Sequence, residues 1–60
     1  MAATLYVMIA HGGDLAGLER GRPADESEAR REAARLLTRD SDIDAVEIWS
    51  GGRLLGAVRA

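Results

Sequence analysis

The chain has no cysteine, and several other residue types that carry chemistry are missing or rare. Without thiols it can form neither a disulfide nor a thiolate metal site. The single histidine, His11, cannot build a zinc site alone. All eight basic residues are arginine, which indicates the codon bias of a GC-rich, bacterial genome. We therefore expect no disulfide, no structural metal ion and no cofactor.

Long hydrophobic runs are also absent. The apolar run Leu5–Ala10 is too short to span a membrane, and no basic segment precedes it. The net charge of −2 argues against binding nucleic acid through bulk charge, because domains that do so are usually basic. We expect a cytoplasmic protein that binds neither a membrane nor nucleic acid.

The length of 60 residues allows a single domain, residues 1–60, with a small core. Domains of this size usually need an additional source of stability, such as a disulfide, a metal ion or association with another chain. Because cysteine is absent and one histidine cannot build a zinc site, association with another chain is the remaining source of stability. The sequence therefore predicts a homo-oligomer, most simply a dimer.

The clearest structural signal is a β-hairpin. Two apolar, β-branched runs, Ile43–Trp49 and Leu54–Val58, flank the dipeptide Gly51-Gly52. Paired glycines supply the positive φ angles of a tight primed turn. A two-residue loop predicts four cross-strand pairs: Ser50 with Arg53, Trp49 with Leu54, Ile48 with Leu55, and Val46 with Ala57.

A helix is predicted between Glu26 and Arg39. Asp25 and Glu28 have the spacing of a capping box, and the first turn is acidic. Four apolar residues fall within one arc of the helix and would face a sheet: Ala29, Ala33, Leu36 and Leu37.

The remaining segments give one strand and one loop. The run Leu5–Ala10 is rich in β-formers and ends at a turn cluster, so we predict a strand. Four glycines and the only proline interrupt residues 11–24, which we interpret as an irregular loop. Two alternatives stay open for residues 15–18: a helical turn, or a short strand that returns beside the first.

These elements predict an α+β fold of order β-α-β-β. One helix packs on one face of a three-stranded antiparallel sheet, as a split β-α-β unit plus a hairpin. The last strand has no acidic residue, whereas the strand before it carries Asp44 and Glu47. Because charged positions suit a sheet edge, we place the last strand in the middle.

One helix can cover only one face of such a sheet, so the other face would expose apolar side chains to water. We predict that this second face forms the oligomer interface. Its predicted residues are Trp49, Leu54 and Val58 of the hairpin and Tyr6 and Met8 of the first strand. Two alternatives stay open for Trp49: an ordinary core residue, or a platform that stacks on a planar ligand.

The cluster His11-Gly12-Gly13-Asp14 follows the first strand. His11, Gly12 and Gly13 could contact an anion or another ligand, because paired glycines can present free backbone N–H groups. The alternative is a turn whose glycines adopt positive φ, with His11 at the surface.

Two charged patterns have an ordinary structural interpretation. Arg31, Arg35 and Arg39 recur on one side of the helix, where they could track phosphates, but glutamates share that side and favour a salt-bridged solvent face. The alternating aspartates of residues 40–44 lack the glycine and distal glutamate of a calcium loop, and favour a turn that ends the helix.

No nucleophile–base or acid–base pair can be assembled from these residues, so we expect a protein that is not an enzyme. The leading hypothesis is a small oligomeric protein that acts through protein–protein association, with itself and with another protein as possible partners. A second hypothesis is an oligomer that binds a flavin-like small ligand at Trp49. A third is a nucleic-acid-associated accessory or antitoxin-like protein that uses the helix arginines.

The second hypothesis follows a resemblance. The β-α-β-β order, the length, the mild acidity and a tryptophan on the second strand are similar to the dodecins, small oligomeric flavin-binding proteins. In that family the tryptophan stacks on the flavin, which the resemblance would assign to Trp49. The chain departs from the family at the tight Gly51-Gly52 turn, and it has no glutamine, which dodecins use against the flavin.

Overall fold

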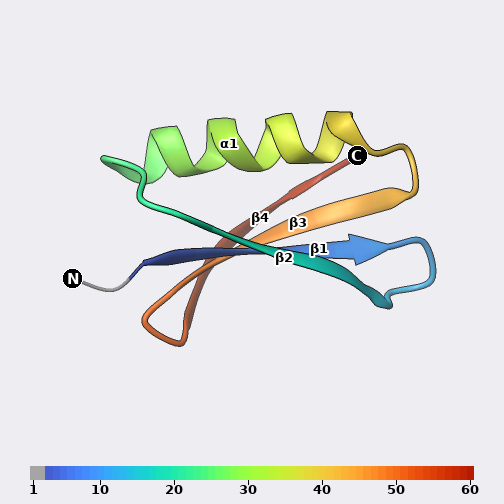
Figure 1. The fold of residues 1–60 in the computed structure, drawn as a ribbon, viewed down its shortest axis with the longest axis horizontal. Helices are drawn as coiled ribbons and strands as arrows, with labels where there is room; N and C mark the ends of the chain where they lie inside the picture. Colours follow the sequence, from blue (N-terminus) through green and yellow to red (C-terminus); the bar gives the residue numbers. More distant parts are fainter. Residues whose placement is uncertain (1–2) are drawn as a thin grey trace.

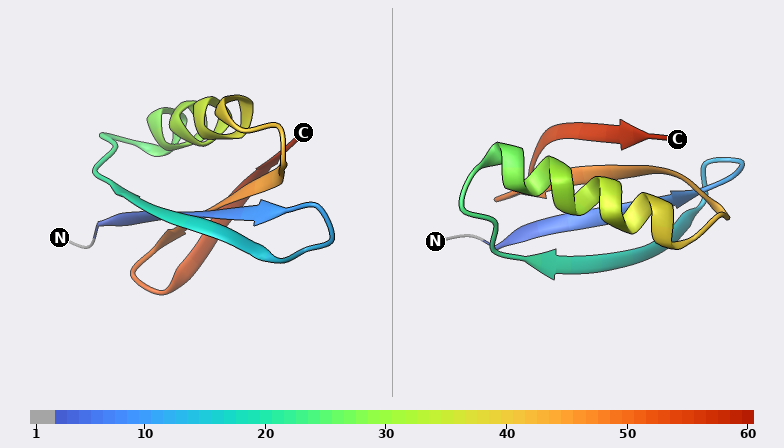
Figure 2. Two further views of the ribbon diagram at one scale, coloured as in Figure 1. Left: turned by 45° about the vertical axis from the view of Figure 1, so that its right-hand side comes forward. Right: turned by 90° about the horizontal axis from the view of Figure 1, so that it is seen from above.

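Four strands and one helix form two layers in a computed structural model that describes residues 3–60. The elements are β1 (Thr4–Ala10), β2 (Leu15–Gly21), α1 (Glu26–Arg39), β3 (Ile43–Ser50) and β4 (Arg53–Arg59). The strands form one antiparallel sheet in the order β2-β1-β3-β4. Figure 1 shows α1 above the sheet, and Figure 2 shows the four strands side by side beneath it.

The α+β class is confirmed, but the three-stranded sheet is wrong. The segment interpreted as a loop contains β2, which pairs with β1 along the edge of the sheet. One of its glycines serves packing, since a Cβ at Gly21 would lie only 2.8 Å from the Tyr6 ring. Part of the glycine content of this segment therefore accommodates a large side chain of β1.

The predicted strand order is also wrong. β3 lies in the middle beside β1, and β4 forms an edge. The two acidic residues of β3 do not prevent this placement. Asp44 is the extra residue at a register shift and is exposed, and Glu47 lies on the sheet face that α1 does not cover.

The helix has the predicted bounds, Glu26–Arg39. Asp25 is its N-cap and accepts a hydrogen bond of 2.9 Å from the Glu28 backbone N–H. The Glu28 carboxylate reaches back and accepts from the Ala24 N–H at 3.2 Å, one residue beyond the usual partner of a capping box.

The core lies between α1 and the inner face of the sheet. Ala29, Ala33 and Leu36 are the buried helix residues, as the helical spacing predicts. The sheet contributes Tyr6, Met8, Ile43, Val46 and Ile48 to the same cluster, and Leu37 and Val58 pack at its margin. No helix in residues 3–60 has the length and apolar character that crossing a membrane requires.

The C-terminal hairpin has the predicted turn but only part of the predicted register. Gly51 and Gly52 adopt φ angles of 58° and 78°, as a primed turn requires. The pairs Ser50–Arg53 and Trp49–Leu54 are confirmed. The register then shifts by one residue at Leu55, which corrects the predicted Ile48–Leu55 and Val46–Ala57 pairs to Ile48–Gly56 and Val46–Val58.

Candidate interaction surface

The sheet face opposite α1 is covered by no element of the structure, and we call it the open face (Figure 1). Successive side chains of a strand point to opposite faces, so the register assigns one residue in two to this side. Twelve positions result, in three rows across strands β2, β1, β3 and β4. The rows are Arg20-Leu5-Trp49-Leu54, Leu18-Val7-Glu47-Ala57 and Leu15-Ile9-Ala45-Arg59.

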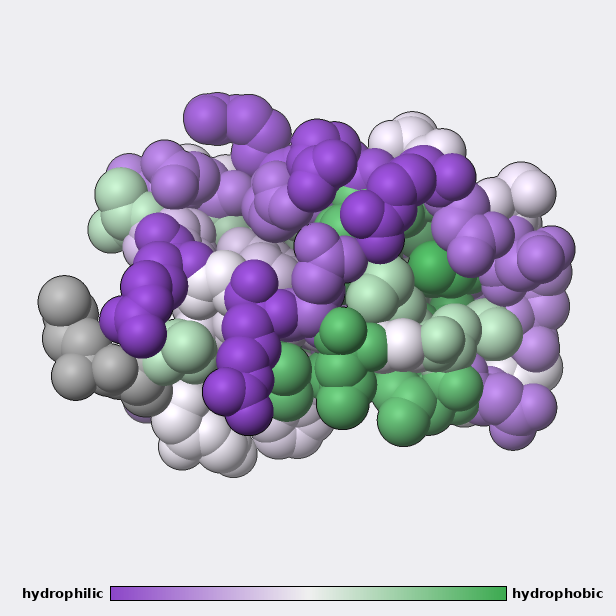
Figure 3. Space-filling view, in the orientation of Figure 1, coloured by the Kyte–Doolittle hydropathy of each residue, from purple (hydrophilic) through white to green (hydrophobic). Residues whose placement is uncertain are grey.

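Nine of these twelve positions are apolar, and the three charged ones are Arg20, Glu47 and Arg59. Three leucines of the open face are strongly exposed: Leu15 at 62%, Leu18 at 55% and Leu54 at 49%. In Figure 3 hydrophobic side chains gather on the side of the molecule away from the helix, whereas the helix side is mostly hydrophilic. The open face therefore presents mostly apolar side chains to the solvent, around the charged Glu47.

A hollow of about 530 Å³ lies at one end of this face. Leu5, Val7 and Trp49 give it an apolar lining, Arg20 lies at its β2 side, and Ala3, Thr4 and the Gly51-Gly52 turn lie at its end. The two glycines contribute no side chains, which leaves the space beside the Trp49 indole open. The open face thus combines exposed leucines with a depression.

The three charged residues of the open face lie in different rows and on different strands. The Trp49 Nε1–H donates a hydrogen bond of 3.1 Å to the Glu47 carboxylate, so the indole N–H is satisfied on its own strand. Arg20 forms no ion pair among residues 3–60. The face therefore carries one engaged carboxylate near its centre and two guanidiniums at opposite corners, those of Arg20 and Arg59, which form no ion pair among residues 3–60.

The predicted interface residues divide between the two faces. Trp49 and Leu54 lie on the open face, as predicted, and Trp49 is partly buried there. Tyr6 and Met8 lie on the opposite side, 2% and 7% exposed beneath α1, so their assignment to the second face is wrong. Val58 also packs against the core, because the register shift at Leu55 turns it inward.

Important residues of the open face were not anticipated on two strands. Leu5 and Val7 lie on the other side of β1 from the predicted Tyr6 and Met8. Leu15, Leu18 and Arg20 lie on β2, in the segment interpreted as a loop. The Leu-Ala-Gly-Leu sequence of residues 15–18 was the available signal, since two leucines follow the turn glycines and could return beside the first strand.

His11 lies in the exposed turn between β1 and β2. Its Nδ1 contacts the Asp44 carboxylate, and its Nε2 lies 3.2 Å from the Ser41 carbonyl oxygen. Both ring nitrogens therefore face acceptors at the start of β3. The side chain ties this turn to the turn that follows the helix.

The backbone of the same turn is also engaged. Gly12 and Gly13 adopt φ angles of 91° and 89°. The His11 N–H donates to the Asp42 carbonyl at 3.2 Å, and the Gly13 N–H donates to the Ala10 carbonyl at 3.0 Å. Two of the three backbone N–H groups of residues 11–13 are therefore bonded within the protein. This geometry favours an ordinary turn over an anion contact.

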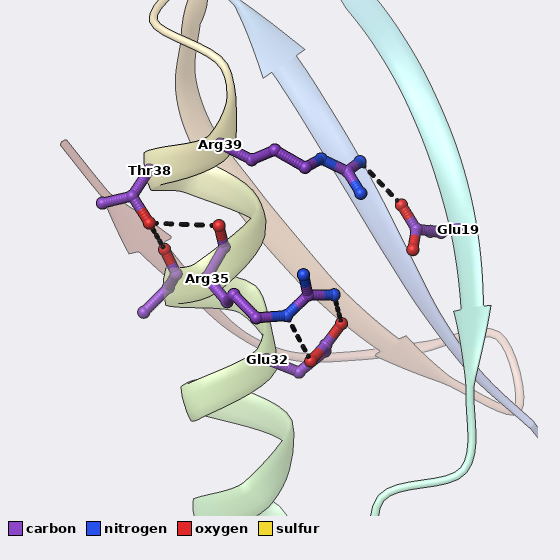
Figure 4. Close-up of polar contacts among 6 residues, drawn as sticks. Glu19, Glu32, Arg35, Thr38 and Arg39 are labelled. Atoms are coloured by element: carbon purple, nitrogen blue, oxygen red, sulfur yellow. Dashed lines mark hydrogen bonds and ion pairs between the residues drawn. The ribbon is translucent and has the colours of Figure 1, made fainter.

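The helix arginines are mostly paired with acidic groups (Figure 4). Arg35 donates two hydrogen bonds to Glu32, which lower the pKa of that carboxyl below its ordinary value. Arg39 reaches from the end of α1 to Glu19 on β2 at 2.9 Å. Two of the three arginines that recur along one side of the helix are thus neutralised. This favours the salt-bridged solvent face over a phosphate-binding one.

No group of histidine, aspartate or glutamate side chains within residues 3–60 has the arrangement of a metal site. The loop between α1 and β3 uses its aspartates locally, since Asp40 Oδ1 accepts from the Asp42 N–H at 2.9 Å. This contact is of the kind that ends a helix in a turn.

The β-β-α-β-β order differs from the β-α-β-β layout on which the resemblance to dodecins depended. Comparisons of the chain with protein-family models, with curated proteins and with solved structures found no match.

Proposed function

We propose that this protein is a non-enzymatic association module that forms a homodimer through its open face. One observation carries the proposal: nine of the twelve side-chain positions are apolar on a sheet face that no helix or strand of residues 3–60 covers. Soluble monomers seldom expose a contiguous apolar patch of more than a few hundred Å². A second copy removes this surface from water and adds to the modest stability of a small domain.

Interface anatomy supports the same assignment. Trp49 and the exposed leucines are the large apolar side chains that act as anchors in interfaces. Arg20 and Arg59 lie at opposite corners of the open face, where their charged ends can stay in water at the rim. A standard interface takes about 800 Å² from each partner. That is about a fifth of the 4063 Å² surface of this chain.

Glu47 favours one of the two simple two-fold arrangements. A two-fold axis that runs across the strands would place the middle row of one copy over the middle row of the other. The two Glu47 carboxylates would then face each other. An axis along the strands sets β1 against β3 of the second copy, so Glu47 faces Val7 and Leu5 faces Trp49. Because opposed like charges are costly, we favour the axis along the strands.

Sedimentation equilibrium tests the dimer directly. We expect a species of twice 6.4 kDa at micromolar concentration for the unmodified chain. Leu18→Asp places a charge on the open face and should give a monomer that retains its circular dichroism spectrum. Ser27→Asp adds the same charge at the exposed start of α1 and should leave the dimer intact.

A second variant tests the face more finely. Glu47→Gln keeps an acceptor for the Trp49 N–H and removes a charge from the centre of the proposed interface. It should tighten the dimer, because the carboxylate no longer has to be desolvated. A monomeric unmodified chain, or equal dimerisation of Leu18→Asp and Ser27→Asp, would overturn the proposal.

A further inference from the structure

The hollow beside Trp49 has the size and chemistry of a small-molecule site. Its volume of about 530 Å³ lies within the usual range of ligand pockets. We propose that it binds an amphipathic carboxylate, a molecule with an apolar body and one carboxylate, and that this ligand displaces the second copy from the open face. The displacement rests on the proposed function, whereas the binding itself does not.

The walls of the hollow specify the apolar part of the ligand. Leu5, Val7 and Trp49 line the space together with Ala3 and Thr4, and Gly51 and Gly52 add no side chains to it. The indole N–H donates to Glu47 and is not available to a ligand. An alkyl chain or flat ring therefore meets carbon surface over most of the hollow, which binds it by excluding water.

Arg20 specifies the charged part. Arg20 is a lining residue of the hollow and forms no ion pair among residues 3–60. A guanidinium offers parallel N–H donors that match the two oxygens of a carboxylate. The carboxylate of Glu47, which could compete, already accepts from Trp49. A single negative group at the β2 side of the hollow therefore complements the site.

The ligand and the second copy need the same side chains. Leu5, Val7 and Trp49 line the hollow and also occupy the two central strands of the open face. A second copy seated on β1 and β3 covers the hollow, and a ligand in the hollow separates the two faces. A ligand that binds only the monomer shifts the equilibrium towards it, so the proposed dimer would respond to ligand concentration.

Octanoate is a suitable probe, with 1-octanol as its neutral counterpart of equal chain length. Binding is measured by Trp49 fluorescence and calorimetry on the Leu18→Asp variant, whose altered residue does not line the hollow. We expect octanoate to bind with an affinity at least about tenfold higher than that of 1-octanol, since a charge-assisted hydrogen bond contributes at this scale. Equal affinities would overturn the carboxylate assignment.

Two matched variants, each made in the Leu18→Asp chain, test whether Arg20 supplies the positive charge that binds the carboxylate. Arg20→Gln should weaken octanoate binding about tenfold and leave 1-octanol binding unchanged. Arg22→Gln makes the same change two residues away, at an exposed arginine that does not line the hollow, and should have no effect. Equal losses in both variants would show general attraction by positive charge and overturn the site.

The unmodified chain tests the displacement. Octanoate should reduce its sedimentation mass towards 6.4 kDa, whereas 1-octanol at equal concentration should do so less. A dimer that persists with octanoate bound would overturn the displacement and leave the proposed function standing. A chain that is monomeric without octanoate would overturn the proposed function, while octanoate binding by the Leu18→Asp variant would still support the hollow as a site.

Discussion

At the scale of single residues, the two leucines of α1 should differ in their contribution to stability. Leu36 has no exposed surface, whereas Leu37 is partly buried at the margin of the core. Leu36→Ala leaves a cavity and should lower the free energy of unfolding by about 2–5 kcal/mol. Leu37→Ala removes less buried surface and should cost about 1 kcal/mol. Urea unfolding followed by circular dichroism measures both, and a larger loss for Leu37→Ala would contradict the helix orientation.

Tyr6 makes folding sensitive to alkaline pH. Its phenol is 2% exposed, and burial raises its pKa above the ordinary value, with further increases from the Glu32 and Glu28 carboxylates. The folded state therefore holds the proton more tightly than the unfolded chain, whose tyrosine pKa is about 10. The stability from this difference is present below that pH and is lost as the pH rises through the folded pKa.

Tyr6 is the only tyrosine, so tyrosinate absorbance reports on this side chain alone. Absorbance should rise at a higher pH than for a free tyrosine and together with unfolding. Tyr6→Phe should move the alkaline unfolding midpoint to higher pH. Titration at the ordinary pH of a tyrosine, with the circular dichroism spectrum unchanged, would contradict this account.

At the scale of secondary structure elements, α1, β1 and the turn of the C-terminal hairpin were predictable from the sequence. Each depends on local chemistry: a cap and apolar spacing for α1, a short apolar run for β1, and two glycines with positive φ for the turn. Local signals of this kind act over a few residues and need no knowledge of the rest of the fold.

The edge strand β2 was not predictable in the same way. Its sequence contains Gly17, Gly21 and two charged residues, which locally indicate a loop. The strand exists because β1 offers a full edge for pairing, and because Gly21 leaves room for the Tyr6 ring. Both reasons are tertiary, so neither is visible in a short window of sequence.

The candidate site was therefore only half predicted. Trp49 and Leu54 follow directly from the hairpin turn, because their pairing precedes the register shift. Beyond it, one extra residue at Leu55 reverses every later position of β4, and Val58 moves to the core. A one-residue change in register exchanges the two faces of a strand, and the sequence pattern of β4 is apolar on both.

At the scale of the whole molecule, the two layers leave the protein with a core on one side of its sheet and an apolar surface on the other. The core consists of α1 and the inner residues of the sheet, with only alanines and two leucines from the helix. If the open face binds a second copy, the energy of association adds to the energy of folding. Stability then depends on protein concentration.

The thermal midpoint of the unmodified chain should rise as its concentration is increased, because mass action favours a folded dimer over unfolded monomers. The midpoint of Leu18→Asp should be lower and independent of concentration, whereas Ser27→Asp should follow the unmodified chain. Calorimetry at several concentrations measures all three. A midpoint of the unmodified chain that does not change with concentration would mean that the two layers are stable alone and that the apolar open face remains in contact with water.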